Sequence, residues 1–213
     1  MRSILLVGAG GHARACIDVV EQEGRFSIAG LIGTRDEVGS AILGYSVRGD
    51  DEAIASLATE FGAAIVAVGQ IKSPEVRIRL FELLTTTRCE LPVIVSPRAY
   101  VSRHATLGEG TIVMHGAIVN AAAKVGRNCI INSQALIEHD SIIEDHCHIA
   151  TGAKINSGVR VGVATFVGSN SSVRQGLVIG EGCVIGMGQR VLTNCAAATQ
   201  LPPRVTSERG IRA

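Results

Sequence analysis

The stretch "AIVNAAAKVGRNCIINSQALIEHDSIIEDHCHIA", residues 117–150, carries a β-branched aliphatic residue at every sixth position. The spacing continues in both directions, and the residue two positions earlier is mostly small. The series has 16 members: Val101, Leu107, Val113, Val119, Val125, Ile131, Ile137, Ile143, Ile149, Ile155, Val161, Val167, Val173, Ile179, Ile185 and Val191. This period is typical of a prism of stacked parallel strands, in which each hexad forms one side. Three sides make one coil, so the series predicts about five coils at a spacing of about 4.8 Å.

The first part of the chain follows a different pattern, in which buried strands alternate with amphipathic helices. "SILLVGAG", "FSIAGLIG" and "AAIVAVG" read as buried strands, and "GYSVRG" and "ELPVIVS" as shorter ones. The stretches between them have helical periodicity. Such alternation predicts a small parallel sheet of Rossmann-like outline. The expected domains are an α/β domain over residues 1–96, an all-β parallel β-helix over 97–194 and a C-terminal tail over 195–213.

Composition argues against nucleic-acid and membrane partners. The chain has 20 basic and 19 acidic side chains, a net charge of +1, only 3% aromatic residues and no Trp. No apolar run reaches the roughly 18 residues that a membrane span needs. The six cysteines contain no CxxC pair, which favours a reduced, cytoplasmic chain with free thiols. Three of them share the small-residue register of the hexads and are expected to fill the core: Cys129, Cys147 and Cys183.

Two motifs together resemble one known family. "LLVGAGGHARACIDVV" (5–20) and "INSQALIEHDSIIEDHCHIATGA" (131–153) are similar to the NeuD/PglD-type sugar acyltransferases, which are left-handed hexapeptide-repeat β-helix enzymes. Members transfer an acetyl group from acetyl-CoA and assemble as homotrimers. The resemblance implies a left-handed prism, acetyl-CoA as co-substrate and a nucleotide-linked sugar as substrate. It further implies N-acetylation of an amino-deoxy sugar in bacterial surface glycan biosynthesis, or alternatively O-acetylation of a sialic acid.

The same resemblance assigns roles to residues of the second motif. It implies that His139 is the general base, that Asp140 orients it and that His148 contacts the thioester region of acetyl-CoA. Asn132 is expected near the acceptor amine. The residues that match the CoA contacts of the family are Gly168, Ser169, Gly186 and Met187.

The chemistry of N-acetylation suits these residue types. An amine bound as ammonium cannot attack a thioester, and imidazole, with a pKa of about 6.5, can accept its proton at neutral pH. No serine or cysteine lies beside His139 in an obvious nucleophile setting, so we expect direct transfer without an acyl-enzyme.

The spacing of the two histidines has a geometric consequence. His139 and His148 are nine residues apart, which is half of a coil of about 18 residues. They should therefore point to different sides of one prism. For both to line one site, they would come from adjacent subunits of a trimer.

The glycine-rich stretch "GAGGHA", residues 8–13, follows a strand and precedes a helix, as dinucleotide-binding loops do. An NAD site also requires an acidic residue at the end of the second strand, and Gly33 and Thr34 stand there instead. In the resembling family this loop holds the nucleotide part of the sugar substrate. The corresponding residues are Gly8, Gly10, Gly11, His12 and, in the turn after the "AAIVAVG" strand, Gly69.

The chain departs from the family at two places. Many members carry acidic residues where Gly33 and Thr34 stand, and "GDN" where this chain has "GQI" at 69–71, so uridine, guanosine and cytidine carriers all stay open. The C-terminal stretch "QLPPRVTSERGIRA" also differs from the usual turn near CoA. Its arginines either meet the CoA phosphates or belong to a solvated tail: Arg204, Arg209 and Arg212.

Two rival functions need different features. A zinc enzyme would use His139, His146 and His148, but their spacing of seven and two places them on incompatible phases of the prism, so we expect no metal. A non-catalytic nucleotide-sugar-binding protein would not need the Glu138–Asp140 triplet. By their phase in the hexads, His104 and His146 are expected at the surface, and His115 has no assigned role.

Overall fold

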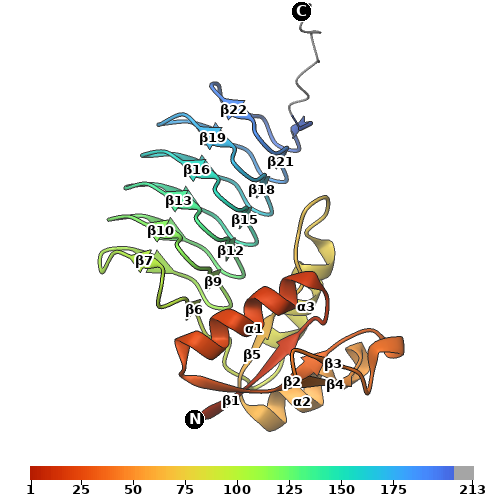
Figure 1. Cartoon of the computed structure of the whole chain (residues 1–213). Helices are drawn as coiled ribbons and strands as arrows, with labels where there is room; N and C mark the ends of the chain where they lie inside the picture. The colour runs from red at the N-terminus through yellow and green to blue at the C-terminus, as the bar shows by residue number, and fades with distance from the viewer. Residues whose placement is uncertain (204–213) are drawn as a thin grey trace, which may run out of the picture.

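The computed structural model describes residues 1–203 as an α/β domain joined to a three-sided β-prism (Figure 1). The first domain contains a five-stranded sheet of order β3-β4-β2-β1-β5. All its pairs are parallel except β3 and β4, which form an antiparallel hairpin at the edge that the sequence did not predict. The elements are β1 (Arg2–Val7), α1 (Gly11–Glu23), β2 (Phe26–Ile32), β3 (Ala41–Ile42), β4 (Tyr45–Gly49), α2 (Ile54–Phe61), β5 (Ala64–Val66) and α3 (Glu75–Thr85), with 3-10 turns at Arg35–Glu37 and Asp51–Ala53.

The prism consists of two-residue strands, each separated from the next by a turn. They form three faces, numbered here in the order in which a coil visits them after β6. Face 1 contains β7 (Tyr100–Val101), β10 (Ile118–Val119), β13 (Leu136–Ile137), β16 (Lys154–Ile155), β19 (Ser172–Val173) and β22 (Arg190–Val191). Face 2 contains β8 (Thr106–Leu107), β11 (Lys124–Val125), β14 (Ile142–Ile143), β17 (Arg160–Val161) and β20 (Val178–Ile179). Face 3 contains β6 (Ile94–Val95), β9 (Ile112–Val113), β12 (Ile130–Ile131), β15 (His148–Ile149), β18 (Phe166–Val167), β21 (Val184–Ile185) and β23 (Gln200–Leu201).

The hexad series forms the core of this prism, as the sequence predicts. From Val113 to Val191 every member of the series is buried, and the residues stack in columns of parallel pairs such as Ile137 on Ile155. The three core cysteines are buried as expected, and each thiol donates a hydrogen bond to a turn carbonyl: Cys129 to Glu144, Cys147 to Gly162 and Cys183 to Ala196.

The junction between the two parts differs from the sequence-based expectation. The "ELPVIVS" strand was expected to close the first sheet, but Ile94 and Val95 pair with β9 and start face 3. At the other end β23 pairs with β21, so the prism extends a few residues beyond the range 97–194. The hexad register could have indicated the first extension, because Val95 stands six residues before Val101. It could not indicate the second, because β23 follows a break in the period.

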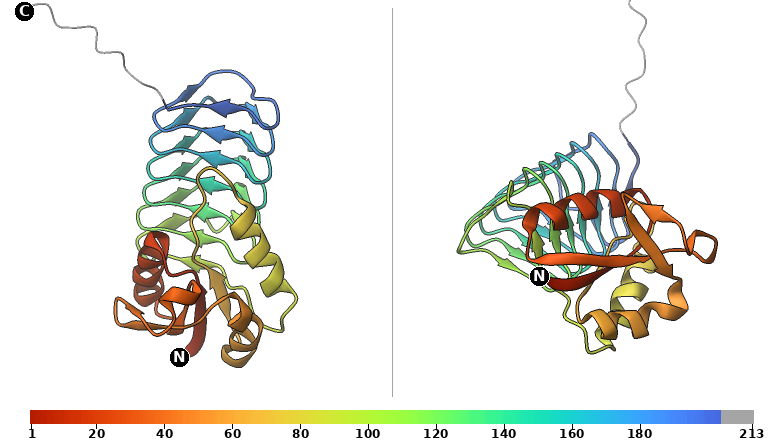
Figure 2. Two further views of the ribbon diagram at one scale, coloured as in Figure 1. Left: turned by 90° about the vertical axis from the view of Figure 1, so that its right-hand side faces the viewer. Right: turned by 60° about the horizontal axis from the view of Figure 1, so that its bottom comes forward.

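Face 3, most of whose strands are labelled in Figure 1, is the side on which the α/β domain sits (Figures 1 and 2). α1 lies between the sheet and this face, since its buried residues share one apolar cluster with Ile94, Ile112, Met114 and Ile130. α2 and α3 pack on the opposite side of the sheet. A shared core of this kind fixes the loops of the α/β domain against the prism. None of the helices within residues 1–203 is long and apolar enough to cross a membrane.

Candidate active site

His139 lies at the corner between β13 of face 1 and β14 of face 2. Its Nδ1 is 2.7 Å from Oδ2 of Asp140. Asp140 adopts a left-handed backbone conformation, with φ of 62°, and its N–H donates to the carbonyl of Ala121 on the preceding coil. The turn thereby aims the carboxylate at the ring. Because a carboxylate accepts the proton of Nδ1, the neutral imidazole keeps its lone pair on Nε2.

Ser157 is a neighbour of this histidine that the sequence did not reveal. Its Oγ lies 2.9 Å from Nε2 of His139, so the expectation that no serine lies beside this histidine is wrong. The two residues are 18 apart, and coils in this prism advance by 18 residues, as the pairing of Ile118 with Leu136 shows. Adding one coil length to position 139 would therefore have found Ser157.

His148 lies on β15 of face 3 and is buried beneath the α/β domain. Its Nδ1 is 2.5 Å from the carbonyl oxygen of Gln70, and its Nε2 is 3.1 Å from Nδ2 of Asn132. A carbonyl only accepts and an amide nitrogen only donates, so His148 carries its proton on Nδ1 and its lone pair on Nε2. The pKa of His148 is lowered to about 4: burial lowers it most, the hydrogen bond to Gln70 opposes this, and the positive charge of Arg77 adds a smaller lowering.

The two histidines lie on different sides of one prism, as their spacing predicts. The corner between faces 1 and 2 is opposite face 3 in a three-sided prism. His139 occupies that corner and is exposed, whereas His148 faces the α/β domain and is 6% exposed. A single chain therefore does not bring the two rings together.

A cavity of about 590 Å³ opens on face 3 above His148 in the coil stack. It contains all four residues that match the CoA contacts of the family: Gly168, Ser169, Gly186 and Met187. Phe166, Val184 and Leu201 form an apolar wall, and Ile71 and Lys72 approach from the loop between β5 and α3. A Cβ on Gly168 would lie 2.6 Å from the backbone nitrogen of Met187, so this position needs glycine for the coils to stack. The C-terminal arginines at 204, 209 and 212 lie outside the described residues.

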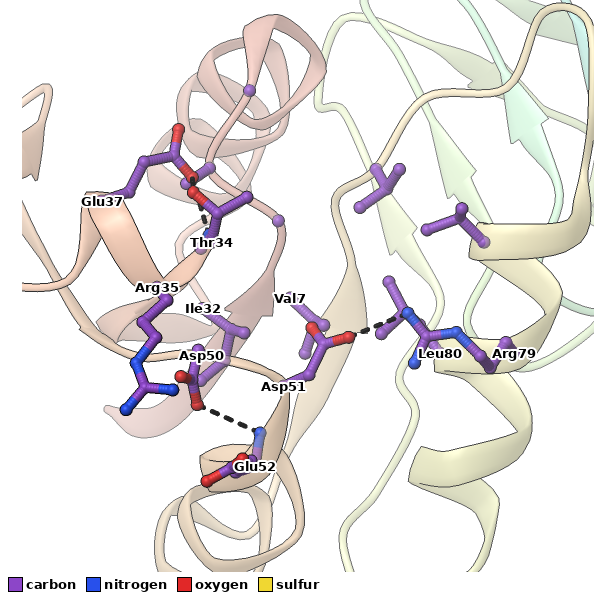
Figure 3. A pocket seen from close by; sticks show the side chains of 16 residues that line it. Val7, Ile32, Thr34, Arg35, Glu37, Asp50, Asp51, Glu52, Arg79 and Leu80 are labelled. Carbon is purple, nitrogen blue, oxygen red and sulfur yellow. Dashed lines mark hydrogen bonds and ion pairs between the residues drawn. The ribbon is translucent and has the colours of Figure 1, made fainter.

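A second cavity of about 590 Å³ lies in the α/β domain, at the carboxyl ends of its parallel strands (Figure 3). Gly8 and Gly10 line it at the start of α1, where nothing lies within 4 Å of a Cβ on Gly10 or Gly11. Its other side carries Thr34, which is bonded to Glu37, and Asp51, which is paired with Arg79. The remaining charged residues of the lining are Arg35, Asp50 and Glu52.

His12 lies near His148 rather than in this cavity. A Cβ on Gly69 would be 3.4 Å from the Cβ of His12, and neither residue belongs to the cavity lining. Burial lowers the pKa of His12 to about 3, assisted by the charges of Arg77 and His148. Its Nε2 is buried and has no hydrogen-bond partner among residues 1–203.

Two further histidines, His146 and His115, make structural contacts. His146 was expected at the surface, but it is half-buried against the ring of Phe81 on α3 and is hydrogen-bonded to Asn128. His115 joins the two domains, with Nδ1 at 2.6 Å from Ser96 and Nε2 at 2.7 Å from Asp18 on α1. Within the described part of the chain, no three His, Cys, Asp or Glu side chains come close enough to hold a metal ion.

Comparison with known proteins identifies both parts of the chain. Residues 3–84 match the PglD N-terminal domain family, and residues 122–157 match the bacterial transferase hexapeptide family of six repeats. The fold of perosamine N-acetyltransferase from Caulobacter crescentus superposes with a TM-score of 0.87 at 28% identity, covering 94% of this chain and 93% of that one. In both of its parts the chain is similar to the PglD/NeuD-type sugar acyltransferases. It is thus an acyltransferase with a left-handed β-helix.

Two further solved structures have the same fold as this chain. The acetyltransferase domain of PglB from Neisseria gonorrhoeae, solved with acetyl coenzyme A, has a TM-score of 0.86 and 26% identity, covering 93% of this chain and 95% of that one. WeeI from Acinetobacter baumannii shares the fold, with a TM-score of 0.66 at 20% identity and coverage of 94% and 96%. The Caulobacter enzyme was solved with CoA and GDP-perosamine, in variants with one histidine replaced. No curated protein sequence matches this chain significantly.

Proposed function

We propose that this PglD/NeuD-type protein transfers the acetyl group of acetyl-CoA to the amino group of a nucleotide-linked amino-deoxy sugar. The observation that carries the proposal is the Asp140–His139 pair, whose Nε2 lone pair lies at an open corner of the prism. Structural neighbours that are 28% and 26% identical bind CoA or acetyl-CoA, and one binds GDP-perosamine, which supports the substrate class.

The two cavities suit the two substrates. The apolar wall of the face 3 cavity fits the pantetheine arm of CoA, and Lys72 supplies a cation for its phosphates. In the α/β cavity Gly10 and Gly11 stand at the start of α1, and the space beside their backbone is unfilled. A helix N-terminus attracts phosphate, so this space suits the phosphates of a nucleotide-linked sugar. The carboxylates on the far side of that cavity accept hydrogen bonds from ribose or base.

The reaction proceeds by direct attack. The amine nitrogen bonds to the thioester carbonyl carbon while Nε2 of His139 takes a proton from it. The C–S bond then breaks, and the CoA thiolate takes this proton from the imidazolium, so that CoA leaves as the thiol and His139 is neutral again. Asp140 stabilises the imidazolium that forms. Before the acceptor binds, the hydroxyl of Ser157 donates a hydrogen bond to Nε2 of His139 and so keeps the ring oriented. This hydroxyl is half-exposed, and the amine replaces it as the hydrogen-bond donor when the acceptor binds.

The active site in this proposal is shared between subunits of a homotrimer. In one chain His139 lies opposite face 3, where the CoA cavity and His148 are found. A cyclic trimer brings the corner of one prism against face 3 of the next at three equivalent interfaces. Each interface then holds one complete site.

A transfer assay tests this function. Purified protein is given acetyl-CoA and a panel of UDP-, GDP- and CMP-linked amino sugars together with their hydroxy counterparts, and the products are analysed by mass. We expect acetylation of an amino sugar on one of the three carriers. Release of CoA without an acetylated sugar in any member of the panel would contradict the proposal.

A further inference from the structure

Arg77 is a fully buried cation without an acidic partner in the described part of the chain. It lies on α3, is 1% exposed, and forms no ion pair there. Its Nη1 donates to the carbonyls of Val66 at 2.8 Å and Val68 at 2.9 Å, and its Nε donates to the carbonyl of Asn128 at 3.2 Å. Its Nη2 is buried without a hydrogen-bond partner among residues 1–203. A buried charge whose only partners are backbone carbonyls is costly, so its position needs an explanation beyond stability.

These three carbonyls belong to the two parts of the molecule that meet at face 3. Val66 ends β5 and Val68 starts the loop that leads to α3, whereas Asn128 lies in the turn before β12 of the prism. The guanidinium therefore fastens the start of the loop to a coil. Figure 2 shows this loop rising along the prism from the α/β domain.

The fastened loop holds His148. Two residues after Val68, the carbonyl of Gln70 accepts the Nδ1 proton of His148, and the side chain of Gln70 contacts the carbonyl of Ala164 at 3.4 Å. With Nδ1 protonated, Nε2 of His148 accepts from Asn132, whose Oδ1 in turn accepts from the backbone of Ser133. Because the Gln70 carbonyl can only accept, it fixes the donor and the acceptor in each hydrogen bond of this series, from His148 through Asn132 to Ser133.

We propose that Arg77 is a positioning residue for acetyl transfer: it clamps the loop so that the Gln70 carbonyl fixes the tautomer of His148 and, through it, the amide of Asn132. This inference rests on the proposed function and deepens it, since His148 and Asn132 are the residues expected beside the thioester and the acceptor. Asn132 is thereby left with one amide proton free to donate towards a bound substrate.

The charge of Arg77 supports the same arrangement. The groups that act on His148 are Arg77 from α3 and His12 from the start of α1, and no carboxylate is bonded to its ring among residues 1–203. Burial and this cation together lower the pKa of His148 and His12. Both rings therefore stay neutral at physiological pH and keep a lone pair.

Two substitutions separate the clamp from the charge. Arg77→Lys keeps a cation but loses the planar fork that bridges three carbonyls, and Arg77→Met removes both. We expect kcat to fall on the order of 10–100-fold in both variants with little change in the KM for acetyl-CoA, as misplacement of a reacting group would do. Arg2→Met, which alters an exposed arginine at the start of β1, is the matched control and should retain full activity.

Nitrogen-15 NMR of labelled histidine supplies a readout that a purely structural role would not change. In the wild-type protein His148 should be protonated on Nδ1. Both variants should shift it towards the Nε2-protonated form, and Arg77→Met should also raise its pKa. A kcat within twofold of wild type in Arg77→Lys, with the Nδ1 tautomer intact, would overturn the proposal, even where Arg77→Met fails to fold. If the wild-type protein shows no transfer at all, the proposed function fails, and the NMR measurement still decides whether Arg77 positions His148.

Discussion

Replacement of His139 by alanine is expected to lower kcat by about 10²–10⁴-fold, the usual contribution of a general base. Without Nε2 no group at this corner takes the proton of the attacking amine, whereas every residue that lines the face 3 cavity is left unchanged. Acetyl-CoA should therefore bind to His139→Ala with unchanged affinity, measured by calorimetry, while steady-state turnover of the amino sugar falls. Raising the pH, which deprotonates the amine in solution, should recover part of the lost rate.

His104→Ala is the matched control for this substitution. His104 is exposed at the same corner of the prism, two coils earlier, and its contact is with the neighbouring Arg103. We expect wild-type turnover from it. A near-wild-type rate in His139→Ala would disprove the role of the base. Acetylation of Ser157 after incubation with acetyl-CoA alone, detected by peptide mass, would replace direct transfer by an acyl-enzyme route.

Mixing two inactive variants should restore activity if the site is shared between subunits. His139→Ala lacks the base, and Ser169→Trp fills the CoA cavity that Ser169 lines. In a trimer reassembled from equal amounts, the subunit that supplies the base to an interface has an intact His139 in about one case in two. The neighbouring subunit has an open cavity in about one case in two as well. About a quarter of the interfaces are then complete, so about a quarter of the wild-type activity should return. The measurement is turnover per chain after joint refolding.

The same mixture distinguishes the two possible architectures. If base and cavity of one chain formed one site, every chain in the mixture would lack one of them, and activity would stay at the background of the separate variants. Mixing two differently tagged samples of His139→Ala provides the blank, because no interface in that mixture holds a base.

The prism was predictable because its period is local and repeats without a break. Each hexad places one aliphatic residue inward, so the position of His139 relative to His148 follows from counting along the coil. The same counting finds Ser157, one coil beyond His139. The four residues expected to contact CoA were named from the resemblance, and the structure brings all four into one cavity because they stand in equivalent turns of successive coils.

The contacts that cross the domain junction were not predictable from periodicity. Arg77 lies in an amphipathic helix where a sequence pattern suggests a solvated side chain, and its partner Asn128 is 51 residues away. Gln70 reaches His148 across 78 residues. His146 is half-buried for the same reason, since Phe81 of α3 covers a turn that would otherwise face water. The hexad pattern describes the interior of the prism and carries no information on what packs against its outside.

The most direct test of the account is the chemical nature of the acetylated product. The protein is given acetyl-CoA with an amino-deoxy sugar and with its hydroxy counterpart on the same nucleotide, and each product is treated with hydroxylamine before mass analysis. The account predicts acetylation of the amino sugar alone, as an amide that survives hydroxylamine. An ester that hydroxylamine cleaves, formed on the hydroxy sugar in preference to the amine, would contradict it.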